Sequence, residues 1–235
     1  MPDTETIAGF IREIAAMAIL PRFRQLRQED IREKKPGDFV TIADLEAERL
    51  LTERLLAAMP GSVVLGEEAA AKDPTRSALL AGEAPVWVID PIDGTANFVR
   101  GEPGFAVILA LVERAEVRAG WIYDPLGDTM VLAERGSGAW GQGRRLAVDG
   151  EASAERMVGA AYGKTVAGPR AGKALSDSGR IAAVRNLGSS ALEYNAVALG
   201  RAHFSLHSRS LPWDHAAGML IVAEAGGVAG FLDGT

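Results

Sequence analysis

The segment from Val86 to Phe98 carries the residues best suited to do chemistry. It runs an apolar strand into Asp90-Pro91-Ile92-Asp93 and then into a turn formed by Gly94 and Thr95. Carboxylates that leave a strand at positions i and i+3 converge hard oxygen ligands of the kind that Mg²⁺ prefers. The turn offers backbone N–H groups and a hydroxyl to a phosphate oxygen. The block therefore indicates a metal and phosphate site, although an Asx turn that satisfies only its own backbone is the alternative.

Three other acidic positions could complete such a site, and each also has an ordinary structural explanation. The Glu67-Glu68 pair follows a short apolar run, where a solvated loop is the alternative. Asp44 stands at capping-box spacing from Thr41, ahead of an apolar helical pattern, so capping alone would explain it. Asp214 precedes a long apolar stretch, which makes a helix N-cap its default role. Only the combination of these positions therefore indicates a site.

The order of these blocks resembles the inositol monophosphatase family of lithium-sensitive, Mg²⁺-dependent phosphatases. The blocks are Asp44, Gly-Glu-Glu at 66–68, Asp-Pro-Ile-Asp-Gly-Thr at 90–95 and Trp-Asp-x-Ala-Ala-Gly at 213–218. The resemblance covers nearly the whole chain. It implies an α/β fold, an α+β layered sandwich in which helix pairs alternate with sheets, with the metal site where two halves meet.

The resemblance also implies a set of metal ligands. A first metal would be held by Glu67, Asp90 and the backbone carbonyl of Ile92. Asp90 would bridge to a second metal that is also bound by Asp93 and Asp214, and a third, weakly held metal would use Glu67 and water. We expect two or three Mg²⁺ ions per site, with Mn²⁺ as a substitute and Li⁺ and Ca²⁺ as inhibitors.

A hydrolytic mechanism follows from the same resemblance. Thr95 and Asp44 would orient and deprotonate the attacking water, and with Glu67 they form the expected catalytic set. Substrate and phosphate contacts are expected from Gly94, Thr95, Ser189 and Ser190. The predicted reaction is hydrolysis of a small phosphate monoester, such as inositol monophosphate, by a metal-activated water. The chain has no Cys, which excludes the phosphatases that use a cysteine nucleophile.

One position departs from the pattern of family members that act on inositol phosphates. Seven residues before the Trp-Asp aspartate those members have a glutamate that contacts sugar hydroxyls, and here the residue is His207. A group that can donate a hydrogen bond replaces one that only accepts. Histidinol phosphate, a nucleotide 3′-phosphate or a sugar bisphosphate is therefore the alternative substrate. A third alternative, a non-catalytic regulatory binding protein, is disfavoured by five intact carboxylates and Thr95.

Composition narrows the class of protein. The chain has 235 residues, is 48% hydrophobic and carries a net charge of −6. It can bury a full core, as one large domain or two small ones. The negative charge argues against nucleic-acid binding, and the apolar runs are too short for a membrane span. The acidic start of the chain indicates no signal peptide, so we expect a cytoplasmic enzyme with a small phosphorylated metabolite as its partner and, from the resemblance, a homodimer.

Hydrophobic periodicity indicates the elements that must position these residues. Helices are expected over 4–20 and 45–58, followed by antiparallel strands over 105–112, 117–123 and 129–133. We place a boundary near residue 143. Residues 1–143 form an N-terminal α+β half with the antiparallel sheet and most metal ligands, and residues 144–235 form an α/β half that supplies Asp214 and substrate contacts. The basic cluster between Arg22 and Lys35 is interpreted as a solvated helix face, although the resemblance puts Lys34 or Lys35 near the metals.

Overall fold

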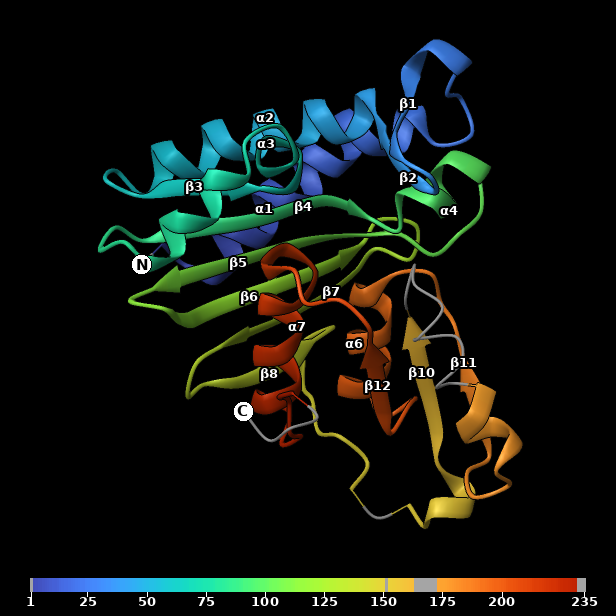
Figure 1. Cartoon of the computed structure of the whole chain (residues 1–235). Helices are drawn as coiled ribbons and strands as arrows, with labels where there is room; N and C mark the ends of the chain where they lie inside the picture. The colour runs from blue at the N-terminus through green and yellow to red at the C-terminus, as the bar shows by residue number, and fades with distance from the viewer. Residues whose placement is uncertain (1, 151, 163–172, 232–235) are drawn as a thin grey trace.

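The computed structural model describes residues 2–150, 152–162 and 173–231, and these residues form four alternating layers (Figure 1). The first layer is a helix pair, α1 (Thr4–Ile14) and α2 (Ile42–Ala58). It covers one face of a large sheet, and a second helix pair, α6 (Ser190–Ala198) and α7 (Pro212–Glu224), covers the other. A small sheet forms the outer layer beside α6. The predicted α/β sandwich of alternating helix pairs and sheets is confirmed.

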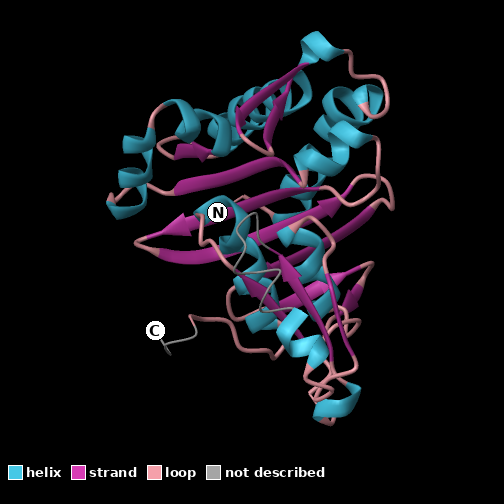
Figure 2. Cartoon of the chain, turned by 45° about the vertical axis from the view of Figure 1, so that its right-hand side comes forward, coloured by secondary structure: helices cyan, strands magenta, loops and turns pink. Residues whose placement is uncertain are grey.

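The large sheet has seven strands in sequence order, and it crosses the middle of the molecule in Figure 2. Its first two strands are parallel and the remainder form an antiparallel meander. The strands are β3 (Val63–Gly66), β4 (Val86–Asp93), β5 (Ala106–Glu113), β6 (Glu116–Asp124), β7 (Thr129–Glu134), β8 (Gly138–Gly141) and β9 (Arg144–Arg145). The three antiparallel strands predicted from periodicity match β5, β6 and β7.

The small sheet is parallel, and short helices follow the first two strands of the large sheet. Its strands lie in the order β11 (Ala183–Arg185), β10 (Val158–Tyr162) and β12 (Phe204–His207). Two six-residue helices, α3 (Glu67–Lys72) and α4 (Thr95–Arg100), follow β3 and β4. Within the described ranges, none of the helices combines the length and the apolar character needed to cross a bilayer.

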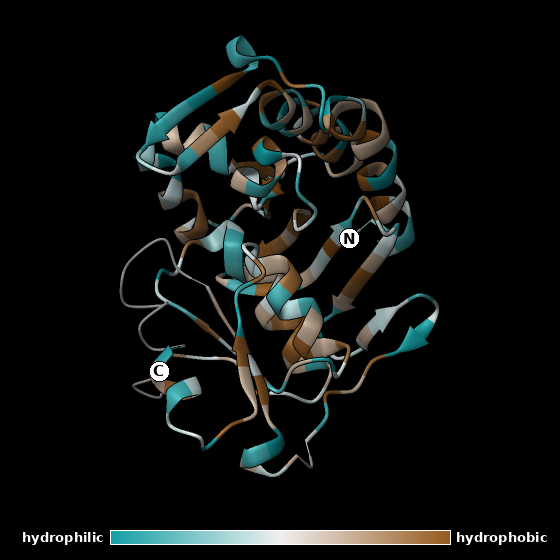
Figure 3. Cartoon of the chain, turned by 90° about the vertical axis from the view of Figure 1, so that its right-hand side faces the viewer, coloured by the Kyte–Doolittle hydropathy of each residue, from teal (hydrophilic) through white to brown (hydrophobic). Residues whose placement is uncertain are grey.

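Alternation along the buried strands builds a core on each face of the large sheet. On β5, Val107 and Leu109 pack toward α1 and α2, whereas Ile108 and Ala110 pack toward α6 and α7. Helix α7 approaches the sheet closely, because an added Cβ on Gly120 would lie 2.8 Å from the Cα of Ala217. In Figure 3, hydrophobic and hydrophilic residues alternate along the helices, as expected for helices that cover a sheet.

The basic cluster is not a helix face. Residues Ile31–Lys35 form β1, which pairs with β2 (Asp38–Thr41) in an antiparallel hairpin. The helix that begins at Thr4 passes into a π-helical stretch at Ala15–Ile19 and ends before this hairpin. The hairpin has little apolar periodicity, so the helix was predicted from the pattern of charges alone, and this prediction is wrong. In the hairpin conformation, Lys34 points toward the candidate site.

Candidate metal and phosphate site

Strand β4 delivers two aspartates to the base of a pocket. All eight residues of β4 are buried, and its pairing with β5 shifts register between Asp90 and Asp93. The Ile92 N–H donates to Asp90 Oδ1 over 3.0 Å, which turns this carboxylate along the strand end. Gly94 follows with φ +91°, and a Cβ there would lie 2.5 Å from the carbonyl oxygen of Gly104. Glycine is therefore required where the chain turns from β4 into α4.

Helix α7 brings a third carboxylate to the same place from the far end of the chain. Oxygen atoms of Asp90, Asp93 and Asp214 all lie within 4.8 Å of one another. Asp214 lies in the first turn of α7, whose N-cap is Leu211, so the predicted N-cap role of Asp214 is wrong. The structure thus brings three of the predicted metal ligands together.

Burial makes it energetically unfavourable for all three carboxylates to be ionised unless a cation is bound. Burial, and then the charges of Glu67 and Asp93, raise the pKa of Asp90 well above its ordinary value. Burial also raises the pKa of Asp93 to about 6, against the opposing effect of its hydrogen bonds. Three crowded carboxylates with hard oxygen atoms fit a divalent cation such as Mg²⁺.

Two buried serines hydrogen-bond to the aspartates of this group. The Ser189 hydroxyl and the Ala191 N–H donate to Asp93 Oδ2 over 2.6 and 2.8 Å. The Ser190 hydroxyl donates to the backbone carbonyl of Asp214 over 3.0 Å. Both serines are fully buried, and the residues that line the pocket do not include them. In this structure Ser189 and Ser190 hydrogen-bond to the aspartates that are expected to bind metal, and their predicted contact with substrate stays a prediction.

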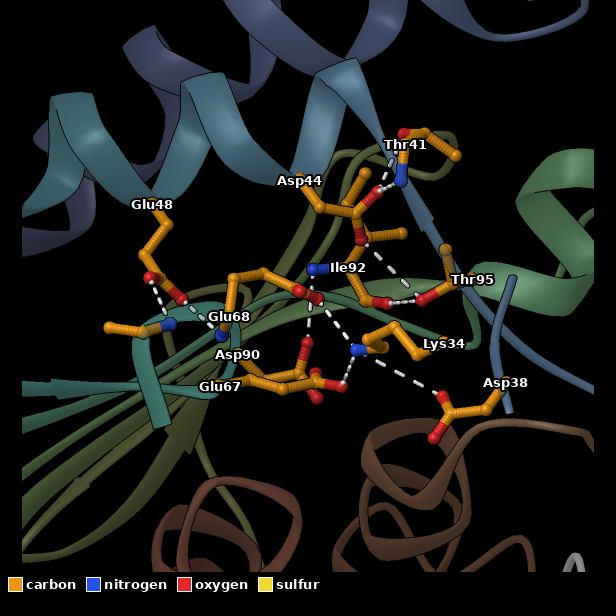
Figure 4. Close-up of polar contacts among 11 residues, drawn as sticks. Lys34, Asp38, Thr41, Asp44, Glu48, Glu67, Glu68, Asp90, Ile92 and Thr95 are labelled. Atoms are coloured by element: carbon orange, nitrogen blue, oxygen red, sulfur yellow. Dashed lines mark hydrogen bonds and ion pairs between the residues drawn. The ribbon is translucent and has the colours of Figure 1, made fainter. Parts of the chain in front are cut away.

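Glu67 enters the pocket at the start of α3, where it meets Lys34 (Figure 4). The Lys34 ammonium donates to Glu67 Oε1 over 2.8 Å and to Glu68 Oε1 over 2.9 Å. Burial opposes the charge on Lys34, but the Glu67 and Glu68 carboxylates together more than offset this and raise the lysine pKa well above its ordinary value. Neither glutamate lies in a solvated loop, since Glu68 is buried and Glu67 lines the pocket. Of the two candidate lysines, Lys34 is the one that contacts the acidic residues.

Asp44 and Thr95 face each other beside the carboxylates. Asp44 forms the predicted capping box, in which the Thr41 N–H and hydroxyl donate to Asp44 Oδ2 over 2.8 and 2.5 Å. Its other oxygen lies 3.5 Å from the Thr95 hydroxyl, which donates to the Ile92 carbonyl over 2.9 Å. Burial raises the pKa of Asp44 to about 8. Asp44 can therefore cap the helix through Oδ2 and still interact with Thr95 through Oδ1.

One pocket joins these parts. It has a volume of about 560 Å³ and is lined by all four acidic candidates for metal binding, namely Glu67, Asp90, Asp93 and Asp214. Ile92, Gly94, Thr95 and His207 line it as well. Its volume suits a small metabolite.

Sequence reasoning missed Glu48, which fixes the start of α3. Its two carboxylate oxygens accept from the Glu68 and Ala69 N–H groups over 2.8 and 2.9 Å (Figure 4). A Cβ on Gly66 would lie 2.3 Å from the Glu48 carboxyl carbon, so glycine leaves room for this contact. The missed signal was a charged residue on the buried face of α2, one turn after Asp44.

We expect Glu48→Gln to lower the free energy of unfolding by about 1–3 kcal/mol, because the amide places a donor against a buried backbone N–H. Urea denaturation measures the change. Glu53→Gln is the matched control, since Glu53 is exposed on the same helix and pairs with the exposed Arg49. Equal stability of the two variants would show that the Glu48 contacts do not fix α3.

Comparisons with known proteins agree with this geometry. The model of the inositol monophosphatase family matches residues 3–235. A fructose-1,6-bisphosphatase/inositol-1-monophosphatase of Thermotoga maritima is 40% identical over 83% of this chain and 73% of its own length. A protein named Nus factor SuhB from Pseudomonas aeruginosa is 33% identical over 91% of this chain and 80% of its own. A solved structure of a Thermotoga maritima IMPase superposes with a TM-score of 0.81 at 34% identity, covering 94% of this chain and 82% of that one.

The match spans almost the whole sequence, and it includes every block on which the expectation was based. The acidic group in this pocket could hold a metal ion, as expected for a family of metal-dependent phosphatases. The chain belongs to the inositol monophosphatase family and is a phosphoric monoester hydrolase.

Proposed function

We propose that the protein hydrolyses a small phosphate monoester with Mg²⁺, and inositol monophosphate is the first substrate to test. The observation that supports this most is the meeting of three buried carboxylates from β4 and α7 at the base of one pocket. Asp90, Asp93 and Asp214 would hold Mg²⁺, with Glu67 and the Ile92 carbonyl as the further ligands. Bound Mg²⁺ would supply the Lewis acidity that activates water and stabilises the leaving alkoxide.

The chain's own groups would orient the reactants. Thr95 accepts a hydrogen bond from the attacking water and passes its own hydroxyl proton toward Asp44 Oδ1, 3.5 Å away. The raised pKa of Asp44, caused by its burial, makes it a stronger base than an exposed carboxylate. Gly94 and Thr95 line the pocket, and the turn that they form after β4 would bind the phosphate. Glu67 is the third residue of the proposed catalytic set, beside Thr95 and Asp44.

The test is a panel of phosphate esters assayed for inorganic phosphate, with and without millimolar Mg²⁺. The panel contains inositol 1-phosphate, histidinol phosphate, a nucleoside 3′-phosphate and fructose 1,6-bisphosphate. We expect Mg²⁺-dependent release from at least one of them. The second candidate, an ester other than inositol phosphate, is favoured by His207, which lines the pocket where a glutamate would accept from sugar hydroxyls. Failure to hydrolyse any ester at any Mg²⁺ concentration would refute the proposal.

Replacement of Thr95 tests the proton path. We expect Thr95→Ala to lower kcat by about 10²- to 10³-fold, because a positioned proton-transfer group contributes on that order. Thr95→Ser keeps the hydroxyl and is the matched control, with a loss of less than about tenfold. Steady-state kinetics at saturating Mg²⁺ measure both variants. Equal rates for the Ala and Ser variants would remove Thr95 from the mechanism.

The division into two halves near residue 143 also stays a proposal, with Asp214 supplied by the second half. A cytoplasmic location and a homodimer remain predictions from the sequence and the resemblance. Light scattering of the purified protein measures the oligomeric state.

A further inference from the structure

Asn97 connects two segments that lie far apart in the sequence. It is the third residue of α4, and it is buried. Its Nδ2 donates to the Gly104 carbonyl over 2.7 Å and to the Leu187 carbonyl over 3.2 Å. Leu187 lies 90 residues further along the chain, in the turn that leads into α6. Both N–H groups of one amide therefore bind backbone oxygens, and these oxygens come from different segments.

Arg100 fixes the orientation of this amide. Its Nη2 donates to Asn97 Oδ1, and its Nε donates to Glu102 Oε2 over 2.8 Å. A flipped amide would place its oxygen against two carbonyl oxygens and its nitrogen against a guanidinium. The surrounding groups thus determine that Nδ2 faces the carbonyls of Gly104 and Leu187.

The backbone approaches this amide closely at two glycines. A Cβ added to Gly104 would lie 2.7 Å from Asn97 Nδ2, and one added to Gly188 would lie 2.6 Å from it. Glycine therefore leaves the space in which Asn97 reaches both segments. Gly188 belongs to the same turn as Leu187, so the amide packs on this turn as well as hydrogen-bonding to it.

The turn held by Asn97 carries Ser189, which is the N-cap of α6. The fully buried Ser189 hydroxyl donates to Asp93 Oδ2 over 2.6 Å. Glu193 Oε1 accepts from the Leu187 N–H over 3.3 Å, so Leu187 is held through its N–H by α6 and through its carbonyl by α4. The carbonyl that Asn97 holds is therefore two residues from the hydroxyl that contacts an expected metal ligand.

We propose that Asn97 is a positioning residue for the metal site. It holds the turn at 187–189 in the place from which the Ser189 hydroxyl orients Asp93 toward Asp90 and Asp214. This inference rests on the proposed metal-dependent phosphatase function. Loss of the Asn97 contacts would leave every expected metal ligand in the chain but loosen one of them. Its effect therefore falls on cation affinity more than on the chemistry of the loaded enzyme.

Calorimetric titration of the metal-free protein with Mg²⁺ tests the inference independently of activity. We expect Asn97→Ala to raise the Kd for Mg²⁺ about 10- to 100-fold, the effect typical of groups that orient a metal ligand. The kcat at saturating Mg²⁺ should change far less, because the ligands themselves are retained.

Asn97→Asp is the second variant, and it decides the question if Asn97→Ala does not fold. It keeps the shape of the side chain and an oxygen for Arg100, but its carboxylate has no N–H to donate. Its Kd for Mg²⁺ should therefore rise as well.

Glu102→Gln is the matched control. Glu102 is exposed, pairs with Arg100 and does not line the pocket. Its replacement removes an ion pair from the same loop but leaves both Asn97 donations in place, so the Kd for Mg²⁺ should stay at the wild-type value. Thermal denaturation of the metal-free proteins verifies that each variant is folded.

A double-mutant cycle with Ser189→Ala tests whether Asn97 acts through Ser189. If it does, Asn97→Ala should raise the Kd far less in a protein that already lacks the Ser189 hydroxyl than in the wild type. Equal increases in both backgrounds would show independent effects and overturn the inference.

Two other results would overturn the inference. One is an Asn97 variant with a lower melting temperature but the wild-type Kd for Mg²⁺, which would make Asn97 a purely structural residue. The other is an equal rise in Kd for Glu102→Gln, which would assign the effect to the whole loop. A wild-type protein that binds no Mg²⁺ and hydrolyses no ester would instead refute the proposed function itself.

Discussion

Asp93→Asn is expected to lower kcat/KM by about three orders of magnitude, roughly 4 kcal/mol of transition-state stabilisation, because a neutral amide replaces the charged carboxylate proposed to bind metal. The fold should survive. Asp93 Oδ2 accepts from the Ser189 hydroxyl and the Ala191 N–H, and the amide oxygen of asparagine can accept both. The amide nitrogen then takes the place of the oxygen that faces Asp90 and Asp214. Kinetics over a range of Mg²⁺ concentrations, with thermal denaturation of the same protein, measure both effects.

Asp177→Asn is the control for this variant, since Asp177 is exposed, pairs with Lys173 and does not line the pocket. It should leave activity and stability at wild-type values. A fully active Asp93→Asn enzyme would show that Asp93 binds no essential metal. An unfolded variant would instead mean that its two hydrogen bonds, and not its charge, are the larger contribution.

Metal addition and removal should produce the second large effect. Chelation with EDTA should abolish phosphatase activity, and readdition of Mg²⁺ or Mn²⁺ should restore it. The metal-free protein should gain stability when Mg²⁺ is added, because a ligand that binds only the folded state stabilises it by about 2.7 kcal/mol at a hundred times its Kd. Thermal denaturation against Mg²⁺ concentration measures this gain, with NaCl of equal ionic strength as the control.

The gain should depend on pH. Burial raises the pKa of Asp93 to about 6, so above about pH 4 the unfolded chain releases a proton that the folded, metal-free protein keeps. The metal-free protein therefore loses stability as the pH rises through this window. Mg²⁺ must displace that proton below pH 6 and meets an ionised carboxylate above it, so the thermal shift should be larger at pH 8 than at pH 5. No shift at millimolar Mg²⁺ at either pH would count against the site.

Local signals in the sequence predicted much of the site. The capping box at Thr41 and Asp44, the strand that ends at Asp93 and the glycine turn after it each depend on a few neighbouring residues. Alternating apolar residues likewise predicted β5, β6 and β7, because each side chain must face one of two cores. Such patterns are readable without knowledge of the rest of the fold.

Contacts between distant segments could not be predicted in this way. The hairpin strand β1 is mostly charged, and its conformation depends on pairing with β2 and on the contact of Lys34 with Glu67. The inward direction of Ser189 follows from where α6 packs, which periodicity does not give. Glu48 was readable in principle, because a carboxylate on the apolar face of a helix demands a buried partner.

The carboxylate group is divided between the end of β4 and the beginning of α7, elements separated by about half of the chain. During synthesis, a ribosome-bound fragment that ends before α7 would possess Glu67, Asp90 and Asp93 but would lack Asp214, the remaining ligand expected for the second metal. The expected second cation site would therefore be complete only after α7 has packed against β6 at Gly120. Binding of this cation would then stabilise molecules in which α7 has docked, relative to partly folded molecules that remain susceptible to proteolysis.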